Sequence, residues 1–523
     1  MTISEMLARN ARMYPHGIAL IELRPSEKVR KEITWREFDE RANRVANALI
    51  HMGIKKGDKV IHLMMNSINW LEAYFGIIRT GAWVVPLNFR FTSSDIKYCA
   101  DVAEAKAFIF GEEFTERVQA IRSQLFTIKN YIFVGQNPPE GMEGFESIMA
   151  KSSPQPPEIA VRDEDECGLY FTSGTTGTPK PILLTHKNME SAAITENCHH
   201  RQKHDDIFLL LQPLYHTGGK MHWFGSLIVG GPTALLCERI TPQTIFEAVH
   251  KERATIAMVL VPWIQDILTA FETGELKKEH YDLSCWRLMH SGAQPVPPSL
   301  IKRWKEHFPT MQYNTDYGLG EASGPGCVQL GIENEHKIGA IGKAGFNWEA
   351  RIANDKGEDV PQGEIGELVV KGNGVMKEYY KNPEKTAETI RNGWLYTGDM
   401  ARMDNDGFIY LVDRKKDVVI CGGENIYPVE VEGVLQSHPK VHDVGVIGVP
   451  DERLGEIVTA VIDPKPGEHL TEEEINAFCE QKLPRYKRPR RIIFDKVPRN
   501  PTGKIEKPKL RQKYAGQQEH FRI

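Results

Sequence analysis

The spacing of apolar residues divides much of the chain into alternating helices and strands. Residues 35–52 place apolar side chains three and four positions apart and are followed by Gly53, a pattern typical of an amphipathic helix that a glycine ends. Residues 59–65 form an apolar run that predicts a strand, and residues 70–79 predict the next helix. Because such units recur through much of residues 55–310, we expect an α/β fold with largely parallel strands.

The pattern changes at the charged segment Asp413-Arg-Lys-Lys-Asp417. This segment separates two strand-like runs, residues 408–412 and 418–421. We place a domain boundary here, with residues 1–413 in a large N-terminal domain and residues 414–523 in a small C-terminal domain. A charged hairpin turn inside one domain is the alternative.

Composition and charge exclude several classes of protein. Hydrophobic residues make up 41% and charged residues 26% of the chain, as in an ordinary soluble globular protein. The net charge of −5 gives no electrostatic reason to expect a nucleic-acid partner. No window reaches the ~18 apolar residues of a membrane span, and the first residues lack the features of a signal peptide. The eight cysteines are scattered without a Cys-x-x-Cys pair, which argues against a disulfide framework or structural zinc and for a cytoplasmic protein.

Residues 170–181 carry the strongest chemical signal in the chain. An apolar lead-in, Leu169 to Phe171, predicts the end of a buried strand and is followed by hydroxyl residues, glycines and a lysine. Glycines let backbone N–H groups approach anionic oxygens, hydroxyls donate further hydrogen bonds, and a lysine adds positive charge. A polar turn between two strands is the alternative, but so specific a segment favours polyphosphate binding. The predicted contacts are Thr172, Ser173, Gly174, Thr175, Thr176, Gly177 and Lys180.

This loop resembles the signature of the acyl-adenylate-forming superfamily, which includes acyl-CoA synthetases, peptide-synthetase adenylation domains and firefly-type luciferases. The resemblance covers roughly residues 34–511, with the motifs in the family's order. It implies that the loop holds the pyrophosphate end of ATP. It also implies a large N-terminal domain of stacked α/β sheets and a small, mobile α+β C-terminal lid domain, with the hinge at Lys416.

Residues 291–295 and 314–321 carry the expected adenine and magnesium contacts. Small residues in the first segment would let a flat base lie against the backbone, and the ring of Tyr317 could stack on it. Glu321 supplies one carboxylate for Mg²⁺, which usually takes one or two. The second segment is similar to the family's Tyr-Gly-x-Thr-Glu motif. The nucleotide contacts predicted from the two segments are Gly292, Ala293, Gln294, Asp316, Tyr317 and Gly318.

The chain departs from the family pattern at two positions. Pro181 stands where the family usually has glycine, and proline fixes φ and removes an N–H at the exit of the loop. Gly320 stands where a family threonine normally contacts the α-phosphate, and whether Ser323 replaces that hydroxyl is open.

Three further segments resemble family motifs. Asp399, in a Thr-Gly-Asp sequence, is suited to accept both ribose hydroxyls, and Arg414 could donate to the same sugar; a turn cap is the alternative for Asp399. Lys504 resembles the family's catalytic lysine, which stabilises the α-phosphate and the carboxylate during adenylation, although an isolated lysine is usually a surface residue. Gly422 and Gly423 resemble the loop that lines the pantetheine tunnel for coenzyme A.

The segment 213–236 resembles the part of the family that borders the acid substrate. His216, in Pro-Leu-Tyr-His, is the candidate gate residue for the thiol, although a lone histidine is more often structural. The segment contains no acidic residue to bind a substrate ammonium group, which disfavours an α-amino acid.

The remaining candidates for contact with the acid are aromatic and polar side chains in or near this segment. Trp223, Phe224 and Trp263 could cap a compact acyl or aryl group, and ordinary core packing is an equal alternative. Lys220 and His222 could meet a polar tail of the substrate.

Together these features predict an ATP-dependent, AMP-forming carboxylate–CoA ligase that makes acyl-CoA through an acyl-adenylate. The expected cofactors are ATP, Mg²⁺ and coenzyme A, the partner is a small carboxylic acid, and a homo-oligomer is left open. The alternatives are an adenylating enzyme that loads a carrier-protein thiol, a luciferase-like oxygenase, and a nucleotide-binding regulator that has lost catalysis.

Overall fold

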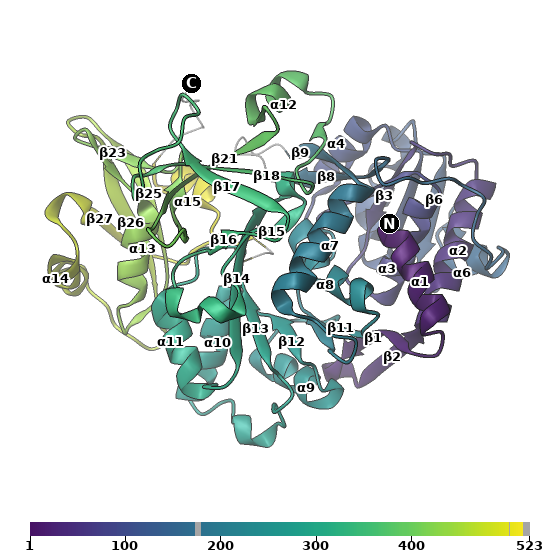
Figure 1. Cartoon of the computed structure of the whole chain (residues 1–523), viewed down its shortest axis with the longest axis horizontal. Coiled ribbons are helices and arrows are strands. Elements are labelled where there is room, and N and C mark those ends of the chain that lie inside the picture. Colours follow the sequence, from purple (N-terminus) through teal and green to yellow (C-terminus); the bar gives the residue numbers. More distant parts are fainter. Residues whose placement is uncertain (173–178, 501–502, 516–523) are drawn as a thin grey trace.

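The computed structural model describes residues 1–172, 179–500 and 503–515, and Figure 1 shows their arrangement. The predicted phosphate-loop residues Ser173, Gly174, Thr175, Thr176 and Gly177 lie outside these ranges. Within the described part of the chain, the strands form four sheets with helices packed between and around them.

The first sheet has a parallel centre and antiparallel edges. In sheet order, its strands are β16 (Lys343–Ala344), β15 (Gly324–Gln329), β14 (Gln312–Leu319), β13 (Leu288–Ser291), β12 (Ile256–Met258), β10 (Phe208–Leu210), β11 (Thr233–Leu236), β1 (Ile18–Arg24) and β2 (Val29–Thr34). The pairs from β14 through β1 are parallel, whereas β2, β15 and β16 join by antiparallel pairing.

The second sheet repeats this plan. In sheet order, its strands are β19 (Glu378–Tyr379), β9 (Lys180–Thr185), β8 (Glu166–Thr172), β4 (Trp83–Pro86), β3 (Lys59–Leu63), β5 (Ala107–Gly111), β6 (Asn130–Val134) and β7 (Glu143–Gly144). Pairing is parallel from β8 through β7 and antiparallel at β9 and β19. The predicted α/β architecture with largely parallel strands is confirmed.

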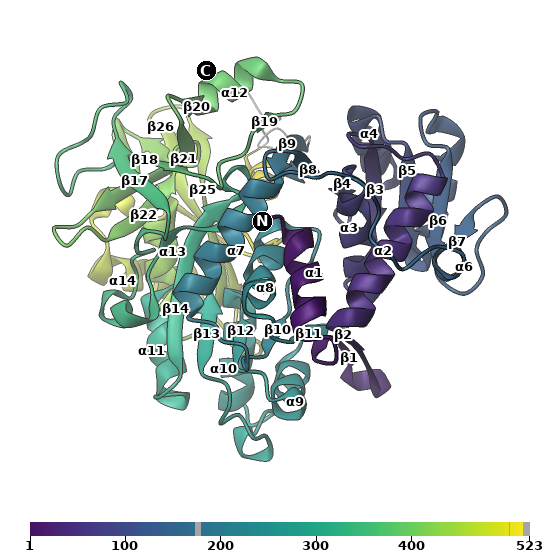
Figure 2. The same cartoon turned by 45° about the vertical axis from the view of Figure 1, so that its right-hand side comes forward.

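Helices fill the space between these two sheets and cover their outer faces (Figure 2). The core between the sheets includes side chains of α1 (Ile3–Met13), α2 (Trp35–His51), α3 (Ile68–Arg79), α6 (Phe145–Ala150), α7 (His186–His200) and α8 (Thr217–Val229). The outer face of the first sheet packs on α9 (Pro242–Glu252), α10 (Val261–Glu272) and α11 (Pro298–His307). That of the second sheet packs on α4 (Ser93–Ala103) and α5 (Thr115–Gln119).

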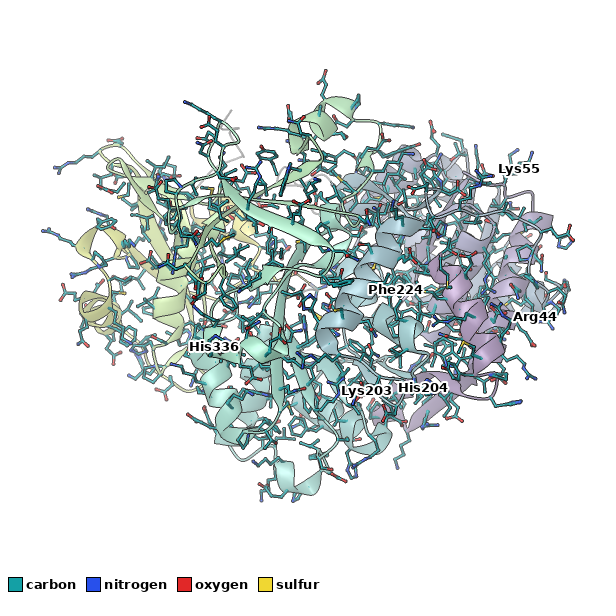
Figure 3. All side chains as sticks on the ribbon, viewed as in Figure 1. Arg44, Lys55, Lys203, His204, Phe224 and His336 are labelled. Atoms are coloured by element: carbon teal, nitrogen blue, oxygen red, sulfur yellow. The ribbon has the colours of Figure 1, made fainter. Side chains whose placement is uncertain are left out.

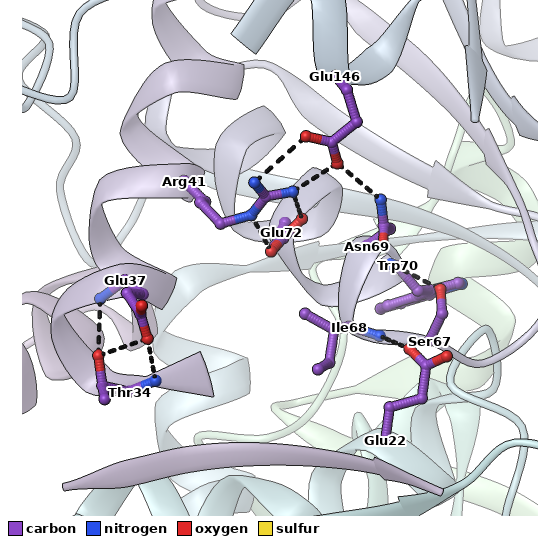
Figure 4. A network of polar contacts seen from close by, with 10 residues as sticks. All are labelled: Glu22, Thr34, Glu37, Arg41, Ser67, Ile68, Asn69, Trp70, Glu72 and Glu146. Carbon is purple, nitrogen blue, oxygen red and sulfur yellow. Dashed lines mark hydrogen bonds and ion pairs between the residues drawn. The ribbon is translucent and has the colours of Figure 1, made fainter. Parts of the chain in front are cut away.

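Capping residues set where the helices begin. Thr34 and Glu37 form a capping box on α2, the helix predicted from the apolar spacing: the N–H of Glu37 donates to the hydroxyl of Thr34 at 3.2 Å, and the N–H of Thr34 donates to the carboxylate of Glu37 at 2.8 Å. Helix α3 begins at Ile68, two residues before the predicted start, because Ser67 caps its first turn. The carboxylate of Glu22 also accepts the N–H of Ile68 at 3.0 Å, where the helix dipole favours negative charge (Figure 4).

The third and fourth sheets are smaller. The third contains β17 (Trp348–Ala353), β18 (Gly366–Gly372), β20 (Ile390–Arg391), β21 (Trp394–Met403) and β22 (Ile409–Arg414), with α12 (Pro383–Thr389) beside it. The fourth contains β23 (Val419–Cys421), β24 (Glu424–Ile426), β25 (Val441–Asp451), β26 (Gly455–Pro464) and β27 (Arg491–Phe494), with α13 (Pro428–Gln436), α14 (Glu472–Lys482) and α15 (Lys507–Tyr514). Since β22 ends at Arg414 and β23 begins at Val419, the charged segment 413–417 joins these two sheets.

Apolar and charged side chains are separated between interior and surface. Phe224 of α8 is fully buried and lies inside the molecule, whereas Lys55 is exposed at its periphery (Figure 3). Among the helices that the structure describes, none has both the length and the apolar character needed to cross a bilayer.

A buried carboxylate joins three of the helices between the sheets (Figure 4). Glu72 of α3 is 1% exposed, and both of its oxygens accept hydrogen bonds from the guanidinium of Arg41 on α2. The same guanidinium lies 2.6 Å from the carboxylate of Glu146 on α6. Burial raises the pKa of Glu72, and the charge of Arg41 opposes that shift. The carboxylate therefore depends on Arg41 for its compensation.

We predict that Arg41→Met lowers the free energy of unfolding by about 3 kcal/mol, because it leaves Glu72 buried without its cation. Urea unfolding at pH 7, followed by tryptophan fluorescence, measures this change. Glu146→Gln is the matched control: its side chain is 65% exposed, so its loss should cost less than about 1 kcal/mol. Equal losses in the two variants would contradict the importance of the buried carboxylate.

Candidate active site

Asp399, Arg414 and Tyr317 meet where the first and third sheets adjoin. Asp399 on β21 is the backbone partner of Arg414 on β22, and its Oδ1 lies 3.2 Å from Nε of that arginine. Tyr317, near the end of β14, donates its hydroxyl to Oδ2 of Asp399 at 2.5 Å. Tyr317 and Asp399 are each 7% exposed. These contacts fix the direction of the carboxylate and the orientation of the tyrosine ring.

The segments predicted to face adenine leave little room for side chains. Ala293 has φ of +67°, in the left-handed region that residues with a side chain rarely adopt. A Cβ at Gly292 would lie 2.6 Å from Oδ1 of Asp316, and a Cβ at Gly318 would lie 1.9 Å from the carbonyl oxygen of Gly324. Glycine is therefore required at both positions by close approach of neighbouring groups. The strained alanine marks the segment directly after Gly292 as specialised backbone.

Glu321 stands at the end of β14, in the short 3₁₀ turn Gly320–Ala322. Its carboxylate is half-buried, and its Oε1 accepts the hydroxyl of Tyr379 at 2.8 Å. A half-exposed carboxylate held by one hydrogen bond fits the single protein ligand that Mg²⁺ commonly takes beside phosphates.

The structure explains the glycine at position 320. A Cβ there would lie 2.8 Å from the methyl group of Thr172, so a threonine at position 320 would require Thr172 to move. Ser323 does not stand in for the missing hydroxyl, because its own hydroxyl is buried and donates to the carbonyl of Gly374 at 2.6 Å.

Pro181 does not interrupt the strand that follows the predicted phosphate loop. Thr172 pairs with Lys180, and Phe171 pairs with Pro181, in the antiparallel ladder of β8 and β9. The carbonyl of Pro181 accepts the N–H of Tyr380 at 2.9 Å, which ties the strand to the next segment. The chain is therefore part of a paired strand from Lys180 onward.

Lys504 reaches this site from the C-terminal part of the chain. Burial, followed by the nearby cation Arg414, lowers the pKa of Lys504 to about 8, and Asp399 opposes the shift. The side-chain oxygen of Asn500 accepts the N–H of Lys504 at 2.9 Å and stabilises the turn before it. The lysine thus lies within electrostatic reach of the Asp399–Arg414 pair.

His216 is the N-cap residue of α8, and its Nδ1 accepts the N–H of Gly218 at 3.1 Å. The side chain of His216 is exposed to solvent, but the many protein atoms around it still make its charged form unfavourable. This burial, together with the cations Lys220 and Lys504, lowers the pKa of His216 to about 4. The imidazole is therefore neutral at pH 7, and it lies close enough to Lys504 to sense its charge.

The residues that follow on α8 are buried more deeply. Lys220 is fully buried, with its Nζ 4.4 Å from the ring centre of Tyr170 and 5.4 Å from that of Tyr74. Burial lowers the pKa of Lys220 to about 7. Trp223 and Phe224 are fully buried in the core between the sheets, and the centroids of their rings are 5.2 Å apart. The structure thus favours core packing for these two rings.

Gly422 and Gly423 form the turn between β23 and β24. Both have positive φ, +61° and +87°, and both are exposed. Two consecutive left-handed residues are typical of a tight hairpin turn, for which glycine is well suited. Their contact with coenzyme A stays a prediction.

Sequence reasoning missed Arg499, which links the two parts of the chain. Its guanidinium binds both oxygens of Asp443 on β25, at 2.7 and 2.6 Å. The same group donates to the side-chain oxygen of Gln294, a predicted nucleotide contact, and to the carbonyl of Gly503. The available signal was its position in the motif that contains Lys504.

Comparison with known proteins identifies the family. Residues 7–380 match the AMP-binding enzyme family, and residues 430–504 match its C-terminal domain. A feruloyl-CoA synthase of Amycolatopsis sp is 34% identical over 97% of this chain and 98% of its own length. The long-chain-fatty-acid–CoA ligase FadD13 of Mycobacterium tuberculosis is 32% identical over 98% of both chains. The anthranilate CoA ligase AuaEII, solved with anthranoyl-AMP, superposes with a TM-score of 0.89 at 28% identity over 98% of this chain and 97% of its own.

The chain therefore belongs to the AMP-binding, adenylate-forming enzymes. It is an ATP-dependent, AMP-forming carboxylate–CoA ligase that makes acyl-CoA through an acyl-adenylate. The fold expected from the sequence, a large N-terminal α/β domain with a smaller C-terminal domain, is confirmed.

We predict that Arg499→Met slows acyl-adenylate formation about tenfold, because a charged hydrogen bond of about 1.5–3 kcal/mol helps to hold Lys504 at the site. Thioester formation from supplied acyl-adenylate should change less. Pyrophosphate exchange and thioester synthesis measure the two steps separately. Arg488→Met is the control, since Arg488 pairs with Glu480 within the C-terminal part. Equal loss in both steps would contradict a specific link to adenylation.

Proposed function

We propose that this ligase activates an aromatic carboxylic acid with Mg-ATP in the conformation described here, and that its C-terminal domain then rotates to admit coenzyme A. Lys504 would be the cation of the first step, Asp399 and Arg414 would bind the ribose, and Tyr317 would stack on the adenine. The observation that carries the proposal is the convergence of Lys504, from the C-terminal part of the chain, with Asp399 and Arg414 on the paired strands β21 and β22.

The first step brings two anions together. The carboxylate of the acid attacks the α-phosphorus of ATP, and pyrophosphate leaves with increased negative charge. Positioned cations lower the barrier most where that charge develops. Lys504 supplies such a cation, and neutral His216 borders the acid without repelling the cations around it. Mg²⁺, which the half-buried Glu321 fits, would add positive charge at the phosphates.

The two lid motifs lie at opposite ends of the fourth sheet. The loop of Lys504 is tied through Arg499 to Asp443, near the start of β25. The glycine turn adjoins Gly455, the partner of Asp451 at the other end of β25. Eight residue steps along a strand span roughly 26 Å at ~3.3 Å each. In any single orientation of the C-terminal domain, only one of the two motifs can therefore reach the acyl group. This supports a domain that begins at residue 414 and rotates between the two steps.

The proposed substrate class rests on the aromatic surroundings of His216. Tyr215 precedes it, and the rings of Tyr215 and Phe89 meet edge to face with centroids 5.5 Å apart. Both are only partly buried, so they are placed to pack against a ligand ring. Two of the compared proteins are named for aromatic acyl groups, feruloyl and anthranoyl.

A panel of acids tests the function. Purified protein with Mg-ATP and coenzyme A is expected to release pyrophosphate fastest with arylacrylic or benzoic acids, with kcat/KM at least about tenfold above that for long-chain fatty acids. Thioester product, measured by mass spectrometry, should match the pyrophosphate released. A preference for long-chain acids would overturn the substrate class, and pyrophosphate release without thioester would overturn coenzyme A as acceptor.

The pKa of Lys504 predicts a pH dependence. Because the pKa is lowered to about 8, the lysine is protonated below that pH and loses its charge above it. We therefore predict that kcat/KM for adenylation, which reports on the free enzyme, falls as pH rises through about 8. In Lys504→Arg the fall should disappear, because an arginine stays charged.

Lys504→Ala provides the control for this assignment. It should lower adenylation about 10²- to 10³-fold while thioester formation from supplied acyl-adenylate continues. An unchanged fall of kcat/KM above pH 8 in Lys504→Arg would assign the titration to another group.

A further inference from the structure

Three histidines and a glutamate that the proposed mechanism does not use form a buried cluster. Glu196 and His200 lie one turn apart on α7, His222 is on α8, and His290 is on β13. All four are fully buried. One ligand atom from each lies within 4.8 Å of those of the others. The cluster therefore joins two helices from the core between the sheets to the first sheet.

The spacing of these atoms is close to that of a metal site. Nε2 of His200 lies 3.1 Å from Nδ1 of His290 and 3.5 Å from Oε2 of Glu196. Ligands held about 2.0–2.1 Å from a tetrahedral zinc ion lie about 3.3 Å from one another. The Nδ1 of His222 is nearer to Oε2 of Glu196, at 2.6 Å, and this pair would open slightly around an ion.

Several of these atoms have no hydrogen-bond partner. Within the described residues, this holds for Oε2 of Glu196, Nδ1 of His200 and both ring nitrogens of His222. Oε2 of Glu196 and Nδ1 of His222 do lie 2.6 Å apart, as an ion pair, so the described atoms left without any close polar contact are Nδ1 of His200 and Nε2 of His222. Buried polar atoms without partners cost free energy, so the geometry calls for a ligand that accepts lone pairs.

The charge of the cluster leads to the same conclusion. Asp316 lies beside it, with its Oδ1 2.8 Å from Nε2 of His290. In the described part of the chain, the ion partners of Glu196 and Asp316 are histidines and not lysine or arginine. Two buried carboxylates without a lysine or arginine beside them favour a cation at the cluster, and a divalent ion would supply that charge.

The surrounding contacts orient the four side chains. Because Nε2 of His290 donates to Asp316, its Nδ1 presents a lone pair toward His200. Such a carboxylate–histidine pair typically supports a metal ligand. Gln329 donates to Oε1 of Glu196 at 2.6 Å, which leaves Oε2 directed at the histidines.

We propose that this cluster binds one divalent transition-metal ion in a closed, four-coordinate structural site, with zinc favoured. The ligands are Glu196, His200, His222 and His290. Imidazole and carboxylate ligands in this number suit zinc, and four protein ligands leave no open position for catalysis. The sequence argument against structural zinc considered cysteines, whereas these ligands are spread over about ninety-five positions of the chain.

Metal analysis tests the proposal. The protein is purified untagged, at full length and without chelator, and is equilibrated with zinc before dialysis. Inductively coupled plasma mass spectrometry is then expected to find about one zinc ion per chain. His200→Ala should hold at least about tenfold less. His199→Ala is the matched control, because this neighbour on α7 instead accepts the N–H of Phe346 at 3.0 Å, and it should keep the full amount.

Cobalt gives a second measurement that does not depend on the folding of the alanine variant. The native protein loaded with Co²⁺ should show the strong visible absorption of four-coordinate cobalt, and His222→Cys should add a thiolate-to-cobalt band. The proposal is overturned if the native protein binds less than about 0.1 zinc ion per chain after equilibration and loaded cobalt keeps the spectrum of the hydrated ion. The cluster would then be a hydrogen-bonded network without metal.

Discussion

The arrangement of the candidate active site depends on placing a lysine beside an arginine. Lys504 enters a region that already holds Arg414, and burial and this like charge both disfavour its charged form. Asp399 opposes part of that effect, but it already pairs with Arg414 and accepts a hydrogen bond from Tyr317. An electrostatic cost therefore remains before a substrate binds, because the pKa of Lys504 is lowered overall. The phosphates of ATP and the carboxylate of the acid are the anions that balance it.

This electrostatic cost explains why contacts away from the chemistry matter. Something other than Lys504 must hold the C-terminal part against the first sheet, and Arg499 has the geometry to do so through Asp443 and Gln294. The long β25–β26 hairpin that carries Asp443 has its own apolar core, so it can move as a rigid unit. A lid that is held by a few polar contacts and is rigid within itself can exchange one orientation for another without unfolding.

The sequence predicted the elements that local rules determine. Helix α2 and strand β3 follow from apolar spacing, and the family resemblance indicated the segments that carry Asp399, Arg414 and Lys504. The sequence could not predict features that depend on contacts between distant segments. A Cβ at Gly320 would clash with Thr172, and Arg499 donates a hydrogen bond to Gln294. In both pairs the residues are far apart in the sequence, so the sequence gives no sign that they are close in space. The cluster of the buried histidines His200, His222 and His290 was missed for the same reason, since each one alone resembles an ordinary core residue in the sequence.

Asp316 connects the buried cluster to the predicted nucleotide site. Its Oδ1 accepts the N–H of His290, its Oδ2 accepts the N–H of Gly326 at 3.0 Å, and its side chain closes the space beside Gly292. The carboxylate cannot turn toward a ligand without breaking these contacts, so it acts on a nucleotide mainly by fixing the backbone at Gly292. Whatever orients His290 therefore also sets the surface on which the adenine is expected to lie. The polar interior behind β13 is in this sense part of the support of the candidate active site.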